Sequence, residues 1–164
     1  MLRQLPALLR GYARRIQQEG ETDLRVVVLL DADSQGAARE LVLEQHAAAA
    51  GLLTSATAPA AAAFFVLNRL AVQELEAWFL GDPAAIRAAY PRLRPAHFKG
   101  LPRDPDGLQK SAPVLLRLLQ QGGYCAGGKQ KIVWATAIAG QMTTWETNAS
   151  ASFRGFCAGL AALR

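Results

Sequence analysis

The stretch Arg25-Val-Val-Val-Leu-Leu-Asp31-Ala-Asp33-Ser34-Gln-Gly36 decides how the chain is expected to fold. Its first part is a continuous apolar and β-branched run, which is typical of a strand buried on both faces in a parallel sheet. Two aspartates, Asp31 and Asp33, follow this run directly. Because open α/β sheets bind ligands at the carboxyl ends of their strands, this strand end is the first candidate for a functional site.

Helices are predicted on both sides of this strand. Between Leu2 and Gln18, apolar residues recur at steps of three and four, which indicates an amphipathic helix that ends at Gly20. After the aspartates, a second helix is expected over residues 37–50, with Asp33 or Ser34 as its N-cap. The unit is therefore a helix, a strand, a loop and a helix.

The rest of the chain contains one more strand and then mainly helices. The second strand is expected over residues 64–72, and the proline-rich stretch 91–107 is expected to form a loop. Helices are predicted over residues 73–80 and 84–90, from Ser111 onward, and over residues 129–142 and 152–163. This order predicts an α/β fold, in which a small Rossmann-like parallel sheet is flanked by helices and the C-terminal half is mainly helical.

The length of 164 residues fits a single domain, with an α/β core over residues 1–90 and a helical part over residues 108–164. The sequence has no apolar run of membrane-spanning length and no signal peptide, so no membrane association is expected. Two distant cysteines predict neither a disulfide framework nor a metal site, which is typical of a cytoplasmic protein. The net charge of +5 permits a polyanionic partner without requiring one.

Asp31 and Asp33 are the strongest chemical signal. At a strand end, both carboxylates can turn toward one point, where a hard divalent cation relieves their repulsion. Mg²⁺ is the expected ion, with Mn²⁺ as the alternative, and such an ion polarises a phosphoryl oxygen and activates water. The competing interpretation is that Asp33 only caps a helix and that Asp31 is solvated.

Three classes of metal-dependent protein place an Asp-x-Asp pair at a strand end. Haloacid-dehalogenase-like phosphatases require Thr or Val two residues after the second aspartate, where this chain has Gln35. Nucleotide-sugar glycosyltransferases are usually larger than this chain. The topoisomerase–primase (Toprim) type of phosphoesterase domain fits the length best.

Glu74 is a third candidate ligand, because it follows the second predicted strand and so approaches the same sheet edge as the aspartates. On the helix expected there, Glu76 points nearly opposite to Glu74, so only one of the two glutamates faces that edge. Leu75, Trp78 and the apolar residues around them are interpreted as core. The alternative role for Glu74 is that of a first-turn acid favoured by the helix dipole.

A second phosphate motif is rejected. Residues 123–129 match the spacing of a phosphate-binding P-loop, but Gln130 stands where Ser or Thr is needed, and no predicted strand precedes the loop. Nucleotide binding is therefore not expected there. Lys129 and Lys131 remain candidates for contact with a polyanion.

Four blocks of this sequence together resemble the bacterial domain-of-unknown-function family 4276: Leu5–Tyr12, Val28–Asp33, Glu74–Asp82 and Ser152–Phe156. The block Glu74-Leu-Glu-Ala-Trp-Phe-Leu-Gly-Asp82 is the most specific of them. Because that family is similar to Toprim-like domains, the resemblance implies a Mg²⁺-dependent nuclease or phosphoesterase acting on nucleic acid. Asp31 and Asp33 are then expected to be metal ligands and catalytic acids, and Glu74, from its position at the sheet edge, is expected to assist them in both roles. A partner protein such as an ATPase, in a phage-defence context, is implied as well.

One departure from the Toprim pattern shapes the alternatives. Toprim-type sites add a glutamate that follows an earlier strand, whereas here no strand ending in Glu is predicted before Asp31. We therefore expect either that the chain begins late or that the protein dispenses with this acid, with Glu74 as a substitute ligand. The alternative function is a non-catalytic interaction module in a phage-defence or toxin–antitoxin type of system.

Overall fold

The computed structural model describes residues 2–60 and 62–163 and divides into two compact units. Unit 1 comprises residues 1–30, 35–70 and 156–164, and unit 2 comprises residues 31–34 and 71–155. Each unit has its own cluster of buried apolar side chains. The expectation of a single domain stays a prediction.

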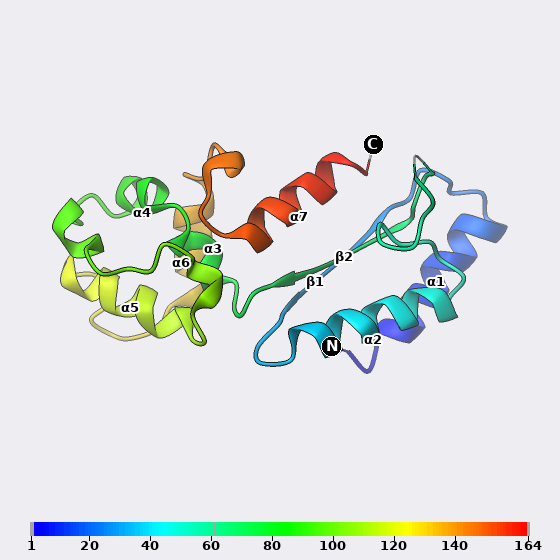
Figure 1. Cartoon of the computed structure of the whole chain (residues 1–164), viewed down its shortest axis with the longest axis horizontal. Helices are drawn as coiled ribbons and strands as arrows, with labels where there is room; N and C mark the ends of the chain where they lie inside the picture. The colour runs from blue at the N-terminus through cyan, green and yellow to red at the C-terminus, as the bar shows by residue number, and fades with distance from the viewer. Residues whose placement is uncertain (1, 61, 164) are drawn as a thin grey trace. The chain divides into compact units, whose positions relative to one another are not determined.

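The fold is mixed α/β, as the sequence predicts, and its elements are labelled in Figure 1. The strands are β1 (Val26–Asp31) and β2 (Val66–Ala71). Within the described residues, the α-helices are α1 (Leu5–Gln18), α2 (Gly36–Ala49), α3 (Glu76–Leu80), α4 (Pro83–Ala89), α5 (Ser111–Gln121), α6 (Lys131–Ala139) and α7 (Ala151–Ala161). Short 3₁₀ turns cover Pro95–Phe98, Pro105–Gly107 and Trp145–Thr147.

The two strands pair in parallel. Val26 N–H donates to Phe65 O at 2.8 Å, and Ala32 N–H donates to Ala71 O at 2.8 Å, so both strands advance in the same direction. Their carboxyl ends therefore lie at one edge of the sheet. This places the residues that follow β1 next to the residues that follow β2.

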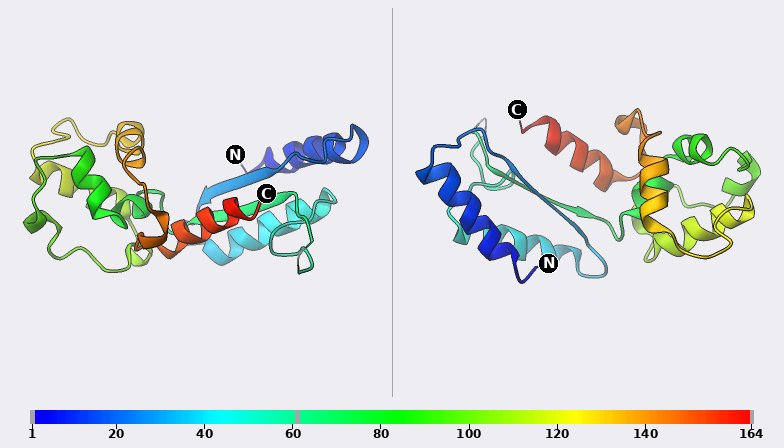
Figure 2. Two further views of the ribbon diagram at one scale, coloured as in Figure 1. Left: turned by 90° about the horizontal axis from the view of Figure 1, so that it is seen from above. Right: turned by 180° about the vertical axis from the view of Figure 1, so that it is seen from behind.

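In unit 1, one face of the sheet is covered by α1 and α2. Val26 and Val66 pack in one cluster with Leu9 of α1 and Leu43 of α2, both fully buried. Figure 2 shows the two helices beside the strands from two further sides. The apolar stripe predicted for α1 is thus the surface that builds this core.

The opposite face of the sheet is covered over β2 but not over all of β1. A Cβ atom on Gly159 of α7 would lie 2.7 Å from Leu67, so only glycine allows this helix to approach the strand so closely. On β1, Val27 points to the same side and is 41% exposed. The sequence predicted burial on both faces of β1, and the structure gives that burial only to Val26 and Val28 on one face.

The core of unit 2 is built mainly by helices, with Tyr90 and Leu93 of the loop that follows α4. Trp134 and Ile138 of α6 pack with Leu115 of α5 and Ile86 of α4, and all four side chains are fully buried. Trp78 and Phe79 of α3 are also buried, as the sequence analysis expects. The mainly helical C-terminal half is therefore confirmed, whereas a complete Rossmann-like or Toprim-like sheet is not established by these two strands.

A hydrogen-bond network in unit 2 fixes the chain that leaves β2. Asp106 accepts hydrogen bonds from the hydroxyl of Ser150 at 2.7 Å and from Ser152 N–H at 2.8 Å. The hydroxyl of Ser152 in turn accepts from the indole N–H of Trp78 at 2.8 Å and from Val72 N–H at 3.4 Å. These bonds hold the backbone on which the candidate site is built.

Two helices begin differently from the prediction. The N-cap of α2 is Gln35, which makes no side-chain cap hydrogen bond, so the prediction of Asp33 or Ser34 as the N-cap residue is wrong. α3 begins at Glu76 rather than at residue 73. The residues before it are held by the end of β1 instead, because Asp33 N–H donates to Gln73 O and Leu75 N–H donates to the Asp31 carboxylate.

No helix among residues 2–60 and 62–163 combines the length and the apolar character that a bilayer crossing requires. This finding agrees with the expectation that the protein has no membrane-spanning segment.

Candidate functional site

A polar cavity of about 430 Å³ lies in unit 2, at the edge where the two strands end. Its lining comprises Asp33 and Ser34 after β1, Gln73 and Glu74 after β2, and Gln109 and Lys110 directly before α5. Two carboxylates, two amides, a hydroxyl and an ammonium thus share one concave surface. The structure brings together two of the three predicted site residues, Asp33 and Glu74.

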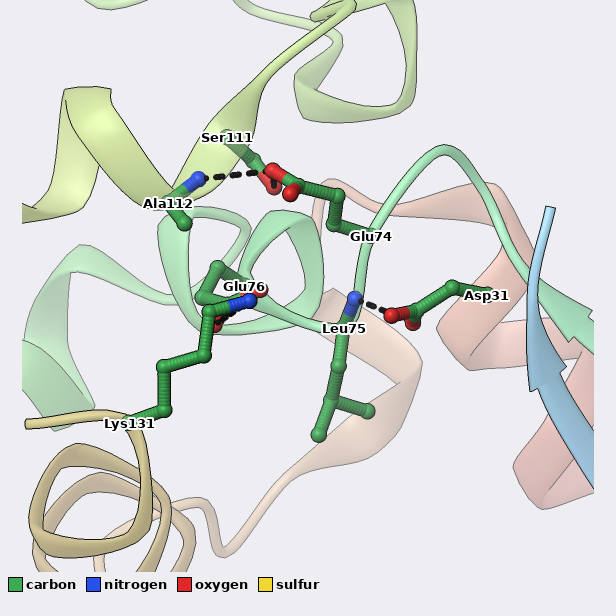
Figure 3. Close-up of polar contacts among 7 residues, drawn as sticks. All are labelled: Asp31, Glu74, Leu75, Glu76, Ser111, Ala112 and Lys131. Atoms are coloured by element: carbon green, nitrogen blue, oxygen red, sulfur yellow. Dashed lines mark hydrogen bonds and ion pairs between the residues drawn. The ribbon is translucent and has the colours of Figure 1, made fainter. Parts of the chain in front are cut away.

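The third predicted residue, Asp31, is attached to the same segment. Asp31 Oδ1 accepts a hydrogen bond from Leu75 N–H at 2.9 Å, next to Glu74 in the chain (Figure 3). Burial raises the pKa of Asp31, and the charges of Glu76 and Asp33 raise it further, while the Leu75 hydrogen bond and the charge of Lys131 oppose the shift. The surroundings of Asp31 therefore disfavour its ionised carboxylate relative to its protonated form.

Asp33 occupies the turn between β1 and α2. Its backbone φ is +47°, in the left-handed region that few residues other than Gly, Asn and Asp adopt readily. This conformation reverses the chain after Ala32, whose N–H still continues the sheet ladder. An aspartate at this position thus satisfies the turn and also supplies a carboxylate to the cavity.

Glu74 caps the N-terminus of α5 from a distant part of the sequence. Its Oε2 accepts from Ala112 N–H at 2.9 Å and from the Ser111 hydroxyl at 3.3 Å (Figure 3). Burial acts to raise the pKa of Glu74, but these hydrogen bonds and the charge of Lys131 outweigh it, so the pKa is lowered. Glu74 is therefore held as a carboxylate, and the acid that the sequence analysis assigned to its own helix stabilises another one.

Glu76 is the buried member of the glutamate pair. Its Oε1 forms an ion pair with Lys131 Nζ at 2.9 Å, and its side chain is 6% exposed, against 49% for the lysine (Figure 3). The prediction that only one of Glu74 and Glu76 faces the sheet edge agrees with this arrangement, since Glu74 lines the cavity and Glu76 does not. The reason differs from the predicted one, because Glu74 precedes α3 rather than lying on it.

The donor set is the one that Mg²⁺ prefers, although the protein does not enclose an ion. Among the residues described, no group of three or more His, Cys, Asp or Glu side chains is arranged to hold a metal together. Mg²⁺ usually keeps several waters and is bound by one or two carboxylates plus substrate phosphate. Asp33 and Glu74, with Asp31 beside them, fit that second kind of site.

Several residues of the cavity escaped sequence reasoning. Gln73, Gln109 and Lys110 belong to no recognised motif, and Lys110 was not among the basic residues singled out. One usable signal was present, because Gln109 and Lys110 stand directly before the predicted helix start at Ser111. Backbone N–H groups at a helix start favour anions, so polar residues directly before a predicted helix are candidates for an anion-binding site.

The chain belongs to a family of domains of unknown function. It matches the family described as Domain of unknown function (DUF4276) over residues 4–161, which confirms the family resemblance. Neither a curated protein nor a solved structure matches the chain.

Proposed function

We propose that this protein is a Toprim-like, Mg²⁺-dependent nuclease or phosphoesterase that acts on nucleic acid. The observation that supports the proposal is the position of Asp33 and Glu74, which follow two adjacent parallel strands and line one cavity with Lys110. Asp31 is the last residue of β1, and its surroundings raise its pKa, which disfavours the ionised carboxylate. Titratable groups of this kind cluster at functional sites.

Asp33 and Glu74 would hold the cation from the cavity, with Asp31 adding negative charge beside them. Mn²⁺ is the alternative to Mg²⁺. When bound, the ion polarises a phosphoryl oxygen and favours ionisation of a water molecule. The hydrogen bonds that Glu74 accepts favour its carboxylate form, which is the form that binds a cation. Its bond to Ala112 N–H also fixes its orientation.

The remaining cavity residues have roles that follow from their chemistry. The ammonium of Lys110 attracts a phosphate, which carries a negative charge along every nucleic acid strand. The side-chain amides of Gln73 and Gln109 have N–H donors for phosphate oxygens or base edges. The hydrolysis itself adds water across one P–O bond and leaves a phosphomonoester and a hydroxyl.

The test is cleavage of DNA and RNA oligonucleotides by the purified full chain with Mg²⁺ or Mn²⁺, and with EDTA in place of the metal. We expect cleavage that requires the metal and that falls by about 100-fold or more in the double variant Asp31→Asn, Asp33→Asn. Asp23→Asn, at an exposed position outside the site, is the matched control and should cleave normally. Equal cleavage by the double variant and the control would remove the aspartates from the mechanism.

The second candidate is a non-catalytic interaction module. The observation that favours it is the use of Asp31 and Glu74 as acceptors for backbone N–H groups, a role that stabilises the fold without any cation. A thermal-shift assay separates the candidates. A rise in unfolding temperature with Mn²⁺ that is lost in the double variant supports the enzyme, and an unchanged unfolding temperature supports the module.

A further inference from the structure

The ion pair between Glu76 and Lys131 has no role in the site described so far. Glu76 is the first residue of α3 and Lys131 is the first residue of α6, so the pair joins two helices of unit 2 (Figure 3). The glutamate is almost completely buried, and the lysine is half-exposed at 49%. The buried partner thus holds a lysine that solvent can reach.

Stability does not explain this pair. Transfer of a carboxylate into the interior costs several kcal/mol, and an ion pair offsets that cost only when its other lone pairs are also satisfied. Glu76 Oε2 is buried and has no hydrogen-bond partner among the residues that the structure describes. Because Ala77, Trp78 and Phe79 beside it are buried, an apolar residue would suit this position better.

The surroundings of Lys131 connect it to the candidate site. The hydrogen bond to Glu76 is the largest cause that raises the pKa of Lys131, and the charges of Glu74 and Asp31 act in the same direction, against desolvation. Glu76, which holds the ammonium at 2.9 Å, is two residues from Glu74 and next to Leu75, whose N–H binds Asp31, so the ammonium lies near both acids (Figure 3). It has three N–H donors, of which the bond to Glu76 uses one.

We infer that Lys131 binds a phosphate of the nucleic acid at the candidate site and that Glu76 is the positioning residue that holds it there. The inference rests on the proposed function. A phosphate that approaches Asp31 and Glu74 meets repulsion from both carboxylates, and one divalent cation does not cancel all of that charge. A fixed ammonium beside the acids supplies the missing positive charge before the substrate arrives, which is the condition for effective electrostatic stabilisation.

The variants are chosen so that binding, catalysis and folding are measured separately. Lys131→Met removes the ammonium, and Glu76→Gln keeps an acceptor but removes the charge that fixes the lysine. The double variant Glu76→Met, Lys131→Met replaces the whole pair by apolar side chains, a change that is often neutral or stabilising, so it remains informative if a single variant does not fold. Lys99→Met, at an exposed position outside the site, is the matched control.

Binding of fluorescein-labelled DNA and RNA oligonucleotides is measured by anisotropy in EDTA at several salt concentrations, and cleavage is measured with Mn²⁺. For Lys131→Met and for the double variant, we expect the slope of log Kd against log salt to fall by about 1. We expect kcat to fall by about 100-fold, as for other lost transition-state donors, while Mn²⁺ affinity is unchanged. The salt slope and kcat of Glu76→Gln should lie between those of these variants and the wild type, and Lys99→Met should match the wild type.

Two results would overturn the inference: an unchanged salt slope in the double variant, or an equal fall of the salt slope in Lys99→Met. Failure of the proposed function has a different signature. If the wild type binds oligonucleotides but does not cleave them, and Lys131→Met still lowers the salt slope, the phosphate contact stands and the hydrolase does not. If the wild type binds no oligonucleotide at all, the inference is wrong.

Discussion

Each unit has a glutamate that faces its interior, and the two carboxylates differ in how completely their oxygens are hydrogen-bonded. In unit 1, Glu44 uses both carboxylate oxygens, which accept from the Thr54 hydroxyl at 2.5 Å and from the Asn68 amide at 2.8 Å. In unit 2, Glu76 has one oxygen paired with Lys131 and the other buried without a partner among the described residues. The first arrangement is what stability requires, and the second is not.

The same contrast extends to the neighbouring groups. The buried polar atom without a partner in the unit 1 cluster is Asn68 Oδ1, a neutral amide oxygen, whose cost is smaller than that of a charge. Beside Glu76, burial and like charges also raise the pKa of Asp31. The carboxylate of Glu44 in unit 1 is therefore fully satisfied, whereas Glu76 and Asp31 of unit 2 are held in surroundings that a purely structural role does not require.

The largest expected effect concerns the satisfied cluster of unit 1. Glu44→Ala leaves the Thr54 hydroxyl and the Asn68 amide without their acceptor, so we expect a loss of about 1–3 kcal/mol in the free energy of unfolding. Urea denaturation followed by circular dichroism measures this loss, with Gln45→Ala, at the exposed neighbouring position of α2, as the control. A loss in the control as large as that in Glu44→Ala would show that the cluster is not what stabilises unit 1.

The next effect concerns the cap that Glu74 provides for α5. Glu74→Ala should cost about 0.5–2 kcal/mol, as for other lost helix caps, and Glu74→Gln less, because its amide oxygen still accepts from Ala112 N–H. Because the pKa of Glu74 is lowered in the folded state, its contribution is complete above the unfolded pKa and is lost as the pH falls through the folded pKa. Unfolding curves of the wild type and Glu74→Gln should therefore converge in acid, and parallel curves would contradict the cap.

The smallest expected effect is a gain in stability rather than a loss, and it concerns Asp31. The pKa of Asp31 is raised, so its protonated form is favoured in the folded state, and the ionised form is a penalty that grows as the pH rises through the folded pKa. Asp31→Asn should therefore raise Tm at neutral pH by at most about 2–4 °C, roughly 1 kcal/mol for a chain of this size. The gain should vanish below the pKa of Asp31. A lower Tm at neutral pH would mean that the carboxylate stabilises the fold.

The sequence predicted the helices and strands well wherever one pattern decided them. The stripe that contains Leu5, Leu9 and Ile16 placed α1 correctly, and the β-branched run after Arg25 placed β1 within one residue. Helix periodicity and strand composition are local properties, so a single sequence carries them. The meeting of Asp33 and Glu74 at one sheet edge was also predicted, because parallel strands place their carboxyl ends together.

The contacts between distant residues were not predictable. No periodicity shows that Glu74 caps α5 or that Glu76 pairs with Lys131, since both contacts depend on how the helices of unit 2 pack. The predicted N-cap of α2 was also wrong, because Asp33 lies in a left-handed turn at the cavity. Local rules assign an acid to the nearest helix, whereas the folded chain uses it where the cavity forms.

Mn²⁺ titration followed by electron paramagnetic resonance tests directly whether Asp33 and Glu74, with Asp31 beside them, bind a divalent cation. The signal of hydrated Mn²⁺ should fall as the wild-type chain binds the ion, and affinity should weaken by at least about tenfold in Asp31→Asn, Asp33→Asn, because fewer charged ligands remain. The control Asp23→Asn should bind as the wild type does. Undiminished Mn²⁺ affinity in the double variant, or no binding by the wild type, would contradict the proposed cation site.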